Sequence, residues 1–363
     1  MSEDIGRRIE EVDTPALWVD LDALDANIWT MASVCRDAGV DWRPHIKASK
    51  SPALAKRLVD GGAVGITCAK VGEAEVMADG GITDILIANE VIGPQKIARL
   101  VALAARITIG VAVDDERNLR ELSAAADSAG VSIDVLVDIN VGMSRCGIPP
   151  AEAPALAQLV LDLPGVALRG LMGYEGHVMG ISDVEEKDAA SRVVADVLAA
   201  GVTALEGAGI EARVRSGGGT GNYWIAAGLG ALTELQAGGG VLMDLTYMEK
   251  MNVPGHQYAL FLTEQVVSTQ TPGRVIGDAG WKALGYHTGS PQVVAPEGVR
   301  FRAPNAEHGI FEVDDGVELN PGDRLTLIPH YSDSTVLLHR QMYAVRRGVV
   351  EEVWPIAAAG MLQ

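Results

Sequence analysis

One lysine-containing segment has the composition of a covalent-catalysis site. Residues 43–50 read RPHIKASK and bring three cations and one histidine to the end of a β-like run. If that run belongs to a parallel barrel, its carboxyl end lies on the active-site face. Neighbouring positive charge favours the neutral amine that a Schiff base requires, which makes Lys47 a candidate. A basic strand end that forms surface ion pairs explains the same residues equally well.

A second segment has the composition of an anion-binding loop. Residues 216–223 read SGGGTGNY and follow another β-like run. Clustered glycines let backbone N–H groups converge on an anion, and the Thr220 hydroxyl adds a donor. A flexible turn is the alternative. Phosphate sites in the loops after the last strands recur in barrels, so the pattern favours phosphate.

A third segment, residues 140–147, reads NVGMSRCG and again follows a β-like run. Arg145 in this segment could hydrogen-bond a cofactor oxygen or a substrate carboxylate. An ion pair at the rim of a barrel is the equal alternative.

The sequence between these segments alternates short apolar runs with Ala- and Leu-rich stretches, which indicates repeated βα units. The candidate strands are Trp42–Lys47, Val64–Ala69, Asp84–Ala88, Ile107–Val113, Ile133–Ile139, Ala167–Tyr174, Ala212–Ser216 and Gly239–Asp244. Helical spacing of apolar residues predicts helices over Glu116–Gly130 and Asp188–Gly209. An open doubly wound sheet would carry its phosphate loop after the first strand, whereas the glycine cluster here comes late. We therefore predict a (β/α)8 TIM barrel, an α/β fold.

The pattern changes after about residue 257, where short strands alternate with Pro/Gly turns. The candidate strands are Leu260–Ser268, Arg274–Asp278, Gly309–Val313, Arg324–Ile328, Gln341–Arg346 and Val349–Trp354. The early run Pro15–Asp20 precedes the barrel and is expected to pair with them. The predicted domains are a barrel over residues 23–246 and a mostly-β domain formed by residues 1–22 and 247–363.

Composition excludes several classes of protein. The net charge of −19 argues against a nucleic-acid partner, which would need clustered Lys and Arg. No apolar stretch reaches the roughly 18 to 20 residues that span a bilayer. The first 13 residues lack the apolar region of a secretory signal, so a cytoplasmic protein is expected. Cys35, Cys68 and Cys146 are widely spaced and are predicted to be reduced thiols.

Together these segments resemble the D-threonine aldolase and D-serine dehydratase family of fold-type III pyridoxal-phosphate enzymes, which are relatives of alanine racemase. The resemblance runs from about Thr14 to Ile356. Its motifs, in chain order, are TPALWVDLDALDANI, RPHIKASK, AVGITCAKVGEAEVM, LVDINVGMSRCGI, GLMGYEGH, SGGGTGNY, TELQ and DAGWKAL, followed by the stretch from His330 to Val336.

The resemblance implies a role for each matched position. Lys47 matches the Schiff-base lysine, Arg145 the arginine near the cofactor ring and Tyr174 the tyrosine that faces the pyridine ring. Gly219, Thr220 and Gly221 match the phosphate cradle. It also implies pyridoxal 5'-phosphate as cofactor, an amino-acid substrate and a homodimer that pairs barrel with β-domain.

The chain departs from the family where the family binds a divalent metal such as Mn²⁺, Mg²⁺ or Zn²⁺. Residues 328–336 read IPHYSDSTV, in which Asp333 is retained but the metal histidine falls on Tyr331, with His330 one place early. Either His330 and Asp333 bind a metal after a one-residue rearrangement, or the metal is lost and Tyr331 transfers protons directly. We favour loss of the metal.

Four other polar residues could line the substrate side of the ring. Glu175 and His177 stand where the aldolases commonly have Tyr-His-Gly, and His287 and His308 are further candidates. Each histidine taken alone is better explained as an ordinary loop residue.

The leading hypothesis is retro-aldol cleavage of a D-β-hydroxy-α-amino acid to glycine, or a substituted glycine, and an aldehyde. The alternatives are β-elimination to a keto acid and ammonia, racemisation or epimerisation at Cα, and a non-catalytic carrier of pyridoxal phosphate. The carrier is disfavoured because simple carriers of this fold lack the β-domain.

Overall fold

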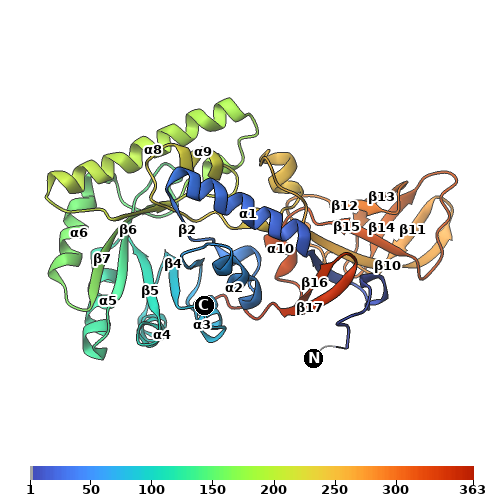
Figure 1. The fold of residues 1–363 in the computed structure, drawn as a ribbon, viewed down its shortest axis with the longest axis horizontal. Coiled ribbons are helices and arrows are strands. Elements are labelled where there is room, and N and C mark those ends of the chain that lie inside the picture. Colours follow the sequence, from blue (N-terminus) through green and yellow to red (C-terminus); the bar gives the residue numbers. More distant parts are fainter. Residues whose placement is uncertain (1–2) are drawn as a thin grey trace. The chain divides into compact units, whose positions relative to one another are not determined.

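The computed structural model describes residues 3–363, which form two compact units. One unit comprises residues 31–47, 55–238 and 361–363, and the other comprises residues 3–30, 48–54 and 239–360. Each unit contains its own sheet (Figure 1). Helix α1 (Leu21–Ala38) contributes residues to both units, so the domain division expected at residue 22 stays a prediction.

The first sheet consists of eight parallel strands in the order β2-β9-β8-β7-β6-β5-β4-β3. Their bounds are β2 Asp41–Trp42, β3 Ile66–Cys68, β4 Asp84–Glu90, β5 Thr108–Val113, β6 Ile133–Asp138, β7 Val166–Gly173, β8 Val214–Gly217 and β9 Glu234–Leu235. A parallel bridge between His45 and Thr67 joins the segment after β2 to β3, so the two ends of this order meet. The predicted TIM barrel is confirmed.

The barrel helices are α2 (Pro52–Asp60), α3 (Val71–Asp79), α4 (Pro94–Ala104), α5 (Glu116–Ala129), α6 (Ala153–Asp162), α7 (Gly176–Met179), α8 (Val184–Gly207) and α9 (Tyr223–Gly228), with α2 shared between the units. The cap predicted for α5 is confirmed, because Gly130 adopts a left-handed φ of 66°. Helix α8 begins before the predicted Asp188, because the Asp183 carboxylate caps it by accepting from the Glu186 N–H at 2.8 Å.

Two strand predictions were wrong at the ends of the barrel. The predicted strand Gly239–Asp244 instead contains a short 3-10 helix, η4 (Gly239–Val241), and the eighth strand is β9. A run of glycines offers no side chain to pack on a sheet, whereas both residues of β9 are buried. The predicted strand Trp42–Lys47 is also shorter, because Ile46–Ala48 forms the 3-10 helix η2.

The second sheet has nine strands and confirms the predicted mostly-β part of the chain. Its strands are β1 Ala16–Asp20, β10 Leu260–Thr271, β11 Arg274–Gly277, β12 Gln292–Ala295, β13 Val299–Pro304, β14 Gly309–Val313, β15 Arg324–Ile328, β16 Gln341–Arg346 and β17 Val349–Pro355. Strand β1 pairs antiparallel with β10 and parallel with β16, as expected for the early run. Strands β12 and β13 were not predicted. The remaining helical segments of this unit include η1 (Ile9–Glu11), the π-helix η5 (Thr246–Lys250) and α10 (Ser332–Val336).

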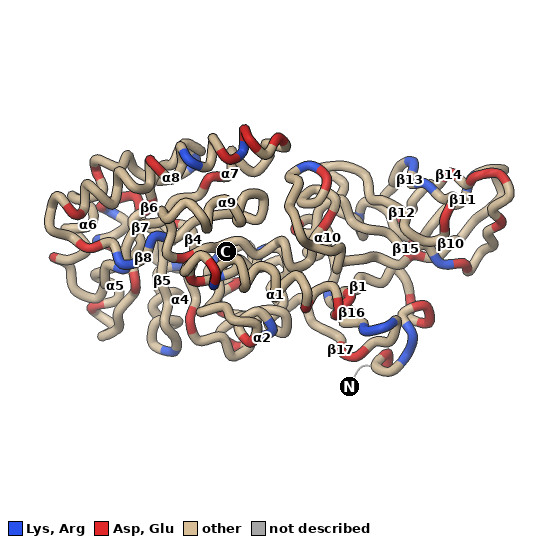
Figure 2. Tube along the Cα trace, turned by 45° about the horizontal axis from the view of Figure 1, so that its top comes forward, with Lys and Arg blue, Asp and Glu red and all other residues tan. Residues whose placement is uncertain are grey.

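Acidic residues are spread over the elements of both units rather than gathered on one (Figure 2). Cys35, Cys68 and Cys146 are all free thiols. Within residues 3–363, no helix is both long and apolar enough to cross a bilayer.

Candidate active site

Lys47 lies at the carboxyl end of the first barrel strand, in the short helix η2. Its side chain is half-buried, and its backbone N–H donates to His45 Nδ1 at 3.2 Å. A Cβ on Gly238 would lie 2.3 Å from the His45 carbonyl oxygen, so only glycine lets the chain pass here. The lysine therefore stands on a segment that is held on two sides, at the end of the barrel where active sites form.

Arg43, one of the two other cations in residues 43–50, does not join Lys47 in a basic cluster. The Arg43 side chain is buried, and its guanidinium binds the Glu234 carboxylate at 2.6 Å and the Asp84 carboxylate at 2.7 Å. These carboxylates belong to the first residues of β9 and β4, so Arg43 serves the amino-terminal end of the barrel. The reading of residues 43–50 as one group of cations around Lys47 was wrong in this respect.

The glycine-rich segment forms a tight loop between β8 and α9. Gly218 has a φ of +80°, and a Cβ there would lie 2.3 Å from Leu235 Cδ1. A Cβ on Gly219 would lie 2.7 Å from Met179 Sδ and 3.3 Å from Tyr174 Cε2. Side chains are excluded at both positions, which leaves the backbone as the lining of a small cradle.

Three of the predicted site residues are neighbours in space. The Tyr174 ring reaches Gly219, and the Arg145 guanidinium lies 5.3 Å from the centre of that ring. Arg145 comes from an exposed loop whose ends are joined by a bridge between Ile139 and Ile148. The structure thus brings together the arginine, the tyrosine and the start of the glycine loop, although they lie in separate βα units.

A buried carboxylate supports the glycine loop. Glu175 is 2% exposed and accepts from Asn222 Nδ2 at 3.0 Å and from the Gly218 N–H at 3.3 Å. Burial raises its pKa, and the bonds from Asn222 and Gly218 oppose that rise. Glu175 is therefore a support of the loop from within the protein, and the expectation that it lines the substrate side is not borne out by its burial. His177 is exposed and lies against Gly142 of the arginine loop.

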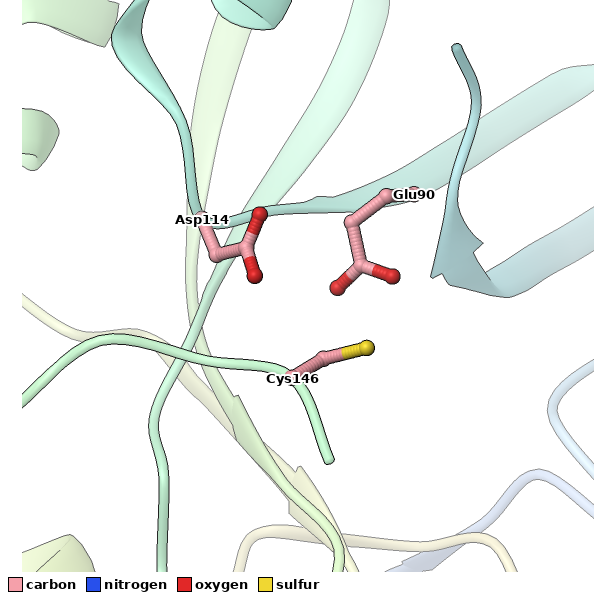
Figure 3. A group of neighbouring side chains, drawn as sticks. All are labelled: Glu90, Asp114 and Cys146. Atoms are coloured by element: carbon pink, nitrogen blue, oxygen red, sulfur yellow. The ribbon is translucent and has the colours of Figure 1, made fainter. Parts of the chain in front are cut away.

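An acidic group lies beside the arginine loop. Glu90, Asp114 and Cys146 each point a possible ligand atom at the others, and these atoms all lie within 4.8 Å of one another (Figure 3). Asp114 accepts from the Gly147 N–H at 3.0 Å, which ties the loop to the end of β5. Burial, followed by Glu90 and Asp114, raises the pKa of the neighbouring Asp138 to about 8. Burial and Glu90 also raise the pKa of Cys146 to about 11, which disfavours a thiolate ligand.

A second polar group lies in the other unit, around Tyr331. Tyr331 precedes α10, and its ring centre lies 5.9 Å from that of Tyr247, with which it shares a side-chain hydrogen bond. The segment is anchored by Asp244, which accepts from both the Ser332 N–H and hydroxyl at 2.7 Å and from the Tyr247 N–H at 2.9 Å. Burial raises the pKa of Asp244 to about 7 against the opposing effect of these bonds. The exposed His287 ring lies edge-on to Tyr331, 6.0 Å between centres.

His330 is committed to neighbours within its own unit. Its Nδ1 lies 2.9 Å from the Thr288 hydroxyl and 3.1 Å from the Thr246 hydroxyl. A Cβ on Gly289 would lie 2.2 Å from Nε2, so that nitrogen faces backbone. Burial, then Lys250 and His287, lowers the pKa of His330. His308 is an exposed loop residue, as expected for a histidine without a role in the site.

Sequence reasoning missed the buried polar residues that hold these loops. Asn222 and Asp244 are fully buried, and Asp138 is 5% exposed. The signal was present, because Asp138 and Asp244 each end an otherwise apolar run. A carboxylate in such a run is costly unless it is hydrogen-bonded, which marks it for a structural or functional role.

Known proteins that resemble this chain in sequence and fold include D-threonine aldolases, 3-hydroxy-D-aspartate aldolases and a dehydratase. Residues 19–245 match the alanine racemase N-terminal domain family, and residues 259–345 match a serine dehydratase domain. The chain is 40% identical to D-threonine aldolase of Arthrobacter sp over 98% of this chain and 95% of that protein. It is 37% identical to 3-hydroxy-D-aspartate aldolase of Paracoccus denitrificans (strain Pd 1222), over 96% of this chain and 93% of that one.

Solved structures agree. The crystal structure of D-threonine aldolase from Filomicrobium marinum has a TM-score of 0.95 and 39% identity, with 99% of each chain covered. The D-threo-3-hydroxyaspartate dehydratase from Delftia sp. HT23 has a TM-score of 0.87 and 27% identity, over 96% of this chain and 98% of that one.

Proposed function

The chain belongs to the alanine racemase-like family, on the branch of the D-threonine aldolases and related dehydratases, and from this premise we propose that it is a pyridoxal-phosphate-dependent aldolase. Its reaction is cleavage of a D-β-hydroxy-α-amino acid to glycine, or a substituted glycine, and an aldehyde. The observation that carries the proposal is the 40% sequence identity to D-threonine aldolase, which extends over 98% of the chain.

The residues of the barrel fit the cofactor. A Cβ on Gly218 or Gly219 would collide with neighbouring side chains, and a loop in which only backbone fits suits a phosphate group. We assign Gly219, Thr220 and Gly221 to the phosphate and the Lys47 amine to covalent attachment. When bound, pyridoxal phosphate would supply an electron sink for the bond that breaks at Cα.

Arg145 and Tyr174 would orient the ring of the cofactor. Their cation–π contact fixes the arginine above the tyrosine, so the two act as one assembly. Tyr174 is followed in the chain by the buried Glu175, whose carboxylate accepts from the Gly218 N–H. This bond connects the ring contacts to the glycine loop.

Cleavage of the Cα–Cβ bond requires that a proton leave the β-hydroxyl. We assign that proton to the Tyr331 oxygen, and its bond with Tyr247 and the anchoring of Ser332 by Asp244 would hold the phenol in one orientation. The Tyr331 oxygen would take this proton as a phenolate and could then return it to Cα of the glycine product.

The surroundings of His330 do not favour the divalent metal of the family. Two threonine hydroxyls lie within hydrogen-bond distance of His330 Nδ1, and Nε2 lies against Gly289. A metal ligand needs one nitrogen directed at the ion and the other held by a partner. We therefore propose a reaction that requires no metal at this position.

A second candidate reaction is β-elimination, because the chain is also 29% identical to D-threo-3-hydroxyaspartate dehydratase of Delftia sp. (strain HT23) over 89% of its length. Both reactions start from the same substrates and differ in product. Incubation with D-threonine, D-phenylserine and D-serine, with assays for aldehyde, glycine, keto acid, ammonia and the L-enantiomer, separates them. Keto acid and ammonia without aldehyde would establish the dehydratase, and the L-enantiomer alone a racemase. Binding of the cofactor without any product would establish a carrier.

We further propose that the protein is a homodimer, as the family resemblance implies, since strands such as β13 and β17 end their sheet and need cover. Light scattering at the working concentration should give twice the mass of the 38.1 kDa chain. An active monomer would refute this proposal.

A further inference from the structure

Helix α8 carries a lysine that the sequence motifs left without a role. Lys187 is fully buried, and its Nζ donates to the carbonyl oxygen of Gly221 at 2.7 Å. The same ammonium lies 5.3 Å from the centre of the Trp224 ring. The carbonyl that Lys187 binds is therefore part of the glycine loop, 34 residues further along the chain.

A buried ammonium is an expensive way to hold a loop. Lysine is almost never fully buried, because its charged form loses its hydration on burial. Burial alone lowers the pKa of Lys187 to about 8. A methionine of similar length would pack in the same place without this cost, so the charge itself is the feature to explain.

The loop is held from one side by two residues one helical turn apart. Lys187 and Ser191 are both buried on α8, four residues apart, and Ser191 Oγ accepts from Asn222 Nδ2 at 3.2 Å. The peptide between Gly221 and Asn222 is thus held at its oxygen by Lys187. At its nitrogen it closes the turn by donating to the Gly219 carbonyl at 3.2 Å.

We propose that Lys187 is a positioning residue of the phosphate site: its buried ammonium fixes the Gly221 peptide and supplies positive charge behind the loop, which favours a dianionic phosphate in the cradle. The inference rests on the proposed function, because it takes the glycine loop as the phosphate site. It adds a fixed cation to a loop that otherwise offers backbone groups and one hydroxyl. In a site with little water, such a charge acts on an anion far more strongly than it would at the surface.

The test uses the full chain freed of cofactor. The variants are Lys187→Met, which removes the charge, and Lys187→Gln, which keeps a donor for Gly221. The matched control is Lys96→Met, at an exposed lysine of α4. Dissociation constants are measured for pyridoxal phosphate and for pyridoxal, and melting temperatures with and without inorganic phosphate.

Both Lys187 variants should raise the dissociation constant of pyridoxal phosphate at least tenfold and change that of pyridoxal less than twofold. They should also lose the rise in melting temperature that phosphate gives the wild type. Their own melting temperatures without phosphate should equal or exceed that of the wild type, a result that a merely structural role would not give. Lys96→Met should match the wild type throughout.

Equal weakening of the binding of pyridoxal and of pyridoxal phosphate would overturn the inference and leave the proposed function standing. So would an unchanged rise in melting temperature with phosphate. A wild type that binds neither pyridoxal phosphate nor inorganic phosphate would overturn both. If Lys187→Met does not fold, Lys187→Gln decides alone; if neither folds, the lysine is required for folding and the inference is overturned.

Discussion

Replacing Tyr331 by phenylalanine tests how this chain moves the proton of the β-hydroxyl. The change removes one oxygen and keeps the ring, including its 5.9 Å and 6.0 Å approaches to Tyr247 and His287. Tyr331 is only half-buried, so the lost hydrogen bond with Tyr247 should lower the free energy of unfolding by about 1 kcal/mol. Folding should therefore survive.

Activity should fall far more than stability. A positioned proton-transfer group contributes roughly 100- to 10,000-fold, which corresponds to about 3 to 5 kcal/mol of activation free energy. We expect kcat to fall by that factor in the aldehyde-release assay, with the cofactor spectrum unchanged. Tyr343→Phe removes another phenol of the same unit, in strand β16, and should keep nearly full kcat.

The same assay after exhaustive EDTA treatment decides between tyrosine and metal. Because Nδ1 of His330 contacts two threonine hydroxyls and Nε2 lies against Gly289, we expect at least half of the activity to remain. Complete loss with EDTA that Mn²⁺ restores, together with a mild Tyr331→Phe phenotype, would refute the reasoning.

Three further outcomes are expected. Lys47→Ala should abolish turnover and the yellow chromophore that borohydride traps on the protein; retention of both would remove Lys47 from the site. Gly218→Ala forces a Cβ into a left-handed conformation, 2.3 Å from Leu235 Cδ1, and should cost about 1 to 2 kcal/mol of unfolding free energy and weaken cofactor binding. In the wild type, Asp138 binds its proton more tightly folded, with a pKa of about 8, than unfolded, near 4, so its contribution to stability is lost as pH rises through about 8. The stability of Asp138→Asn relative to the wild type, from denaturant unfolding, should therefore rise between pH 5 and 8, and a constant difference would contradict the buried, protonated carboxyl.

Local sequence was sufficient for those parts of the fold that one residue or one run decides. The cap at Gly130, the existence of the early strand β1 and the alternation of βα units all follow from local rules. Contacts between distant segments were not accessible in this way. Nothing near Asp244 in the sequence says that it will accept from Ser332, 88 residues away.

The wrong grouping of Arg43 with Lys47 comes from the predicted end of the first barrel strand. Arg43 and Lys47 were read as one cationic group because they are close in sequence. A continuous strand would place side chains four residues apart on one face, whereas a helical turn after the strand redirects them. Here β2 ends at Trp42 and η2 starts at Ile46, so Arg43 and Lys47 lie in different surroundings.

Two sets of buried or half-buried charges in the barrel unit differ in how they are accommodated. At the starts of the strands, Arg43 and Arg169 are ion-paired with three carboxylates, those of Asp84, Asp134 and Glu234. Such a network is satisfied within the protein, and breaking one buried pair should cost about 3 to 5 kcal/mol of stability.

Toward the opposite end, burial instead acts on three titratable groups, of which Asp138 ends a strand, Glu175 follows one and Lys187 lies on helix α8. Asp138, Glu175 and Lys187 all have pKa values shifted toward their neutral forms, with burial as the largest cause. Each of these groups contacts a loop that carries a proposed cofactor residue or lies beside one. A fold selected only for stability would place apolar residues there. The cost in stability of these buried groups is explained if an anionic ligand binds between the loops. Such a ligand would stabilise the charged lysine and leave the carboxyls protonated. The protein would then be most stable with the ligand bound.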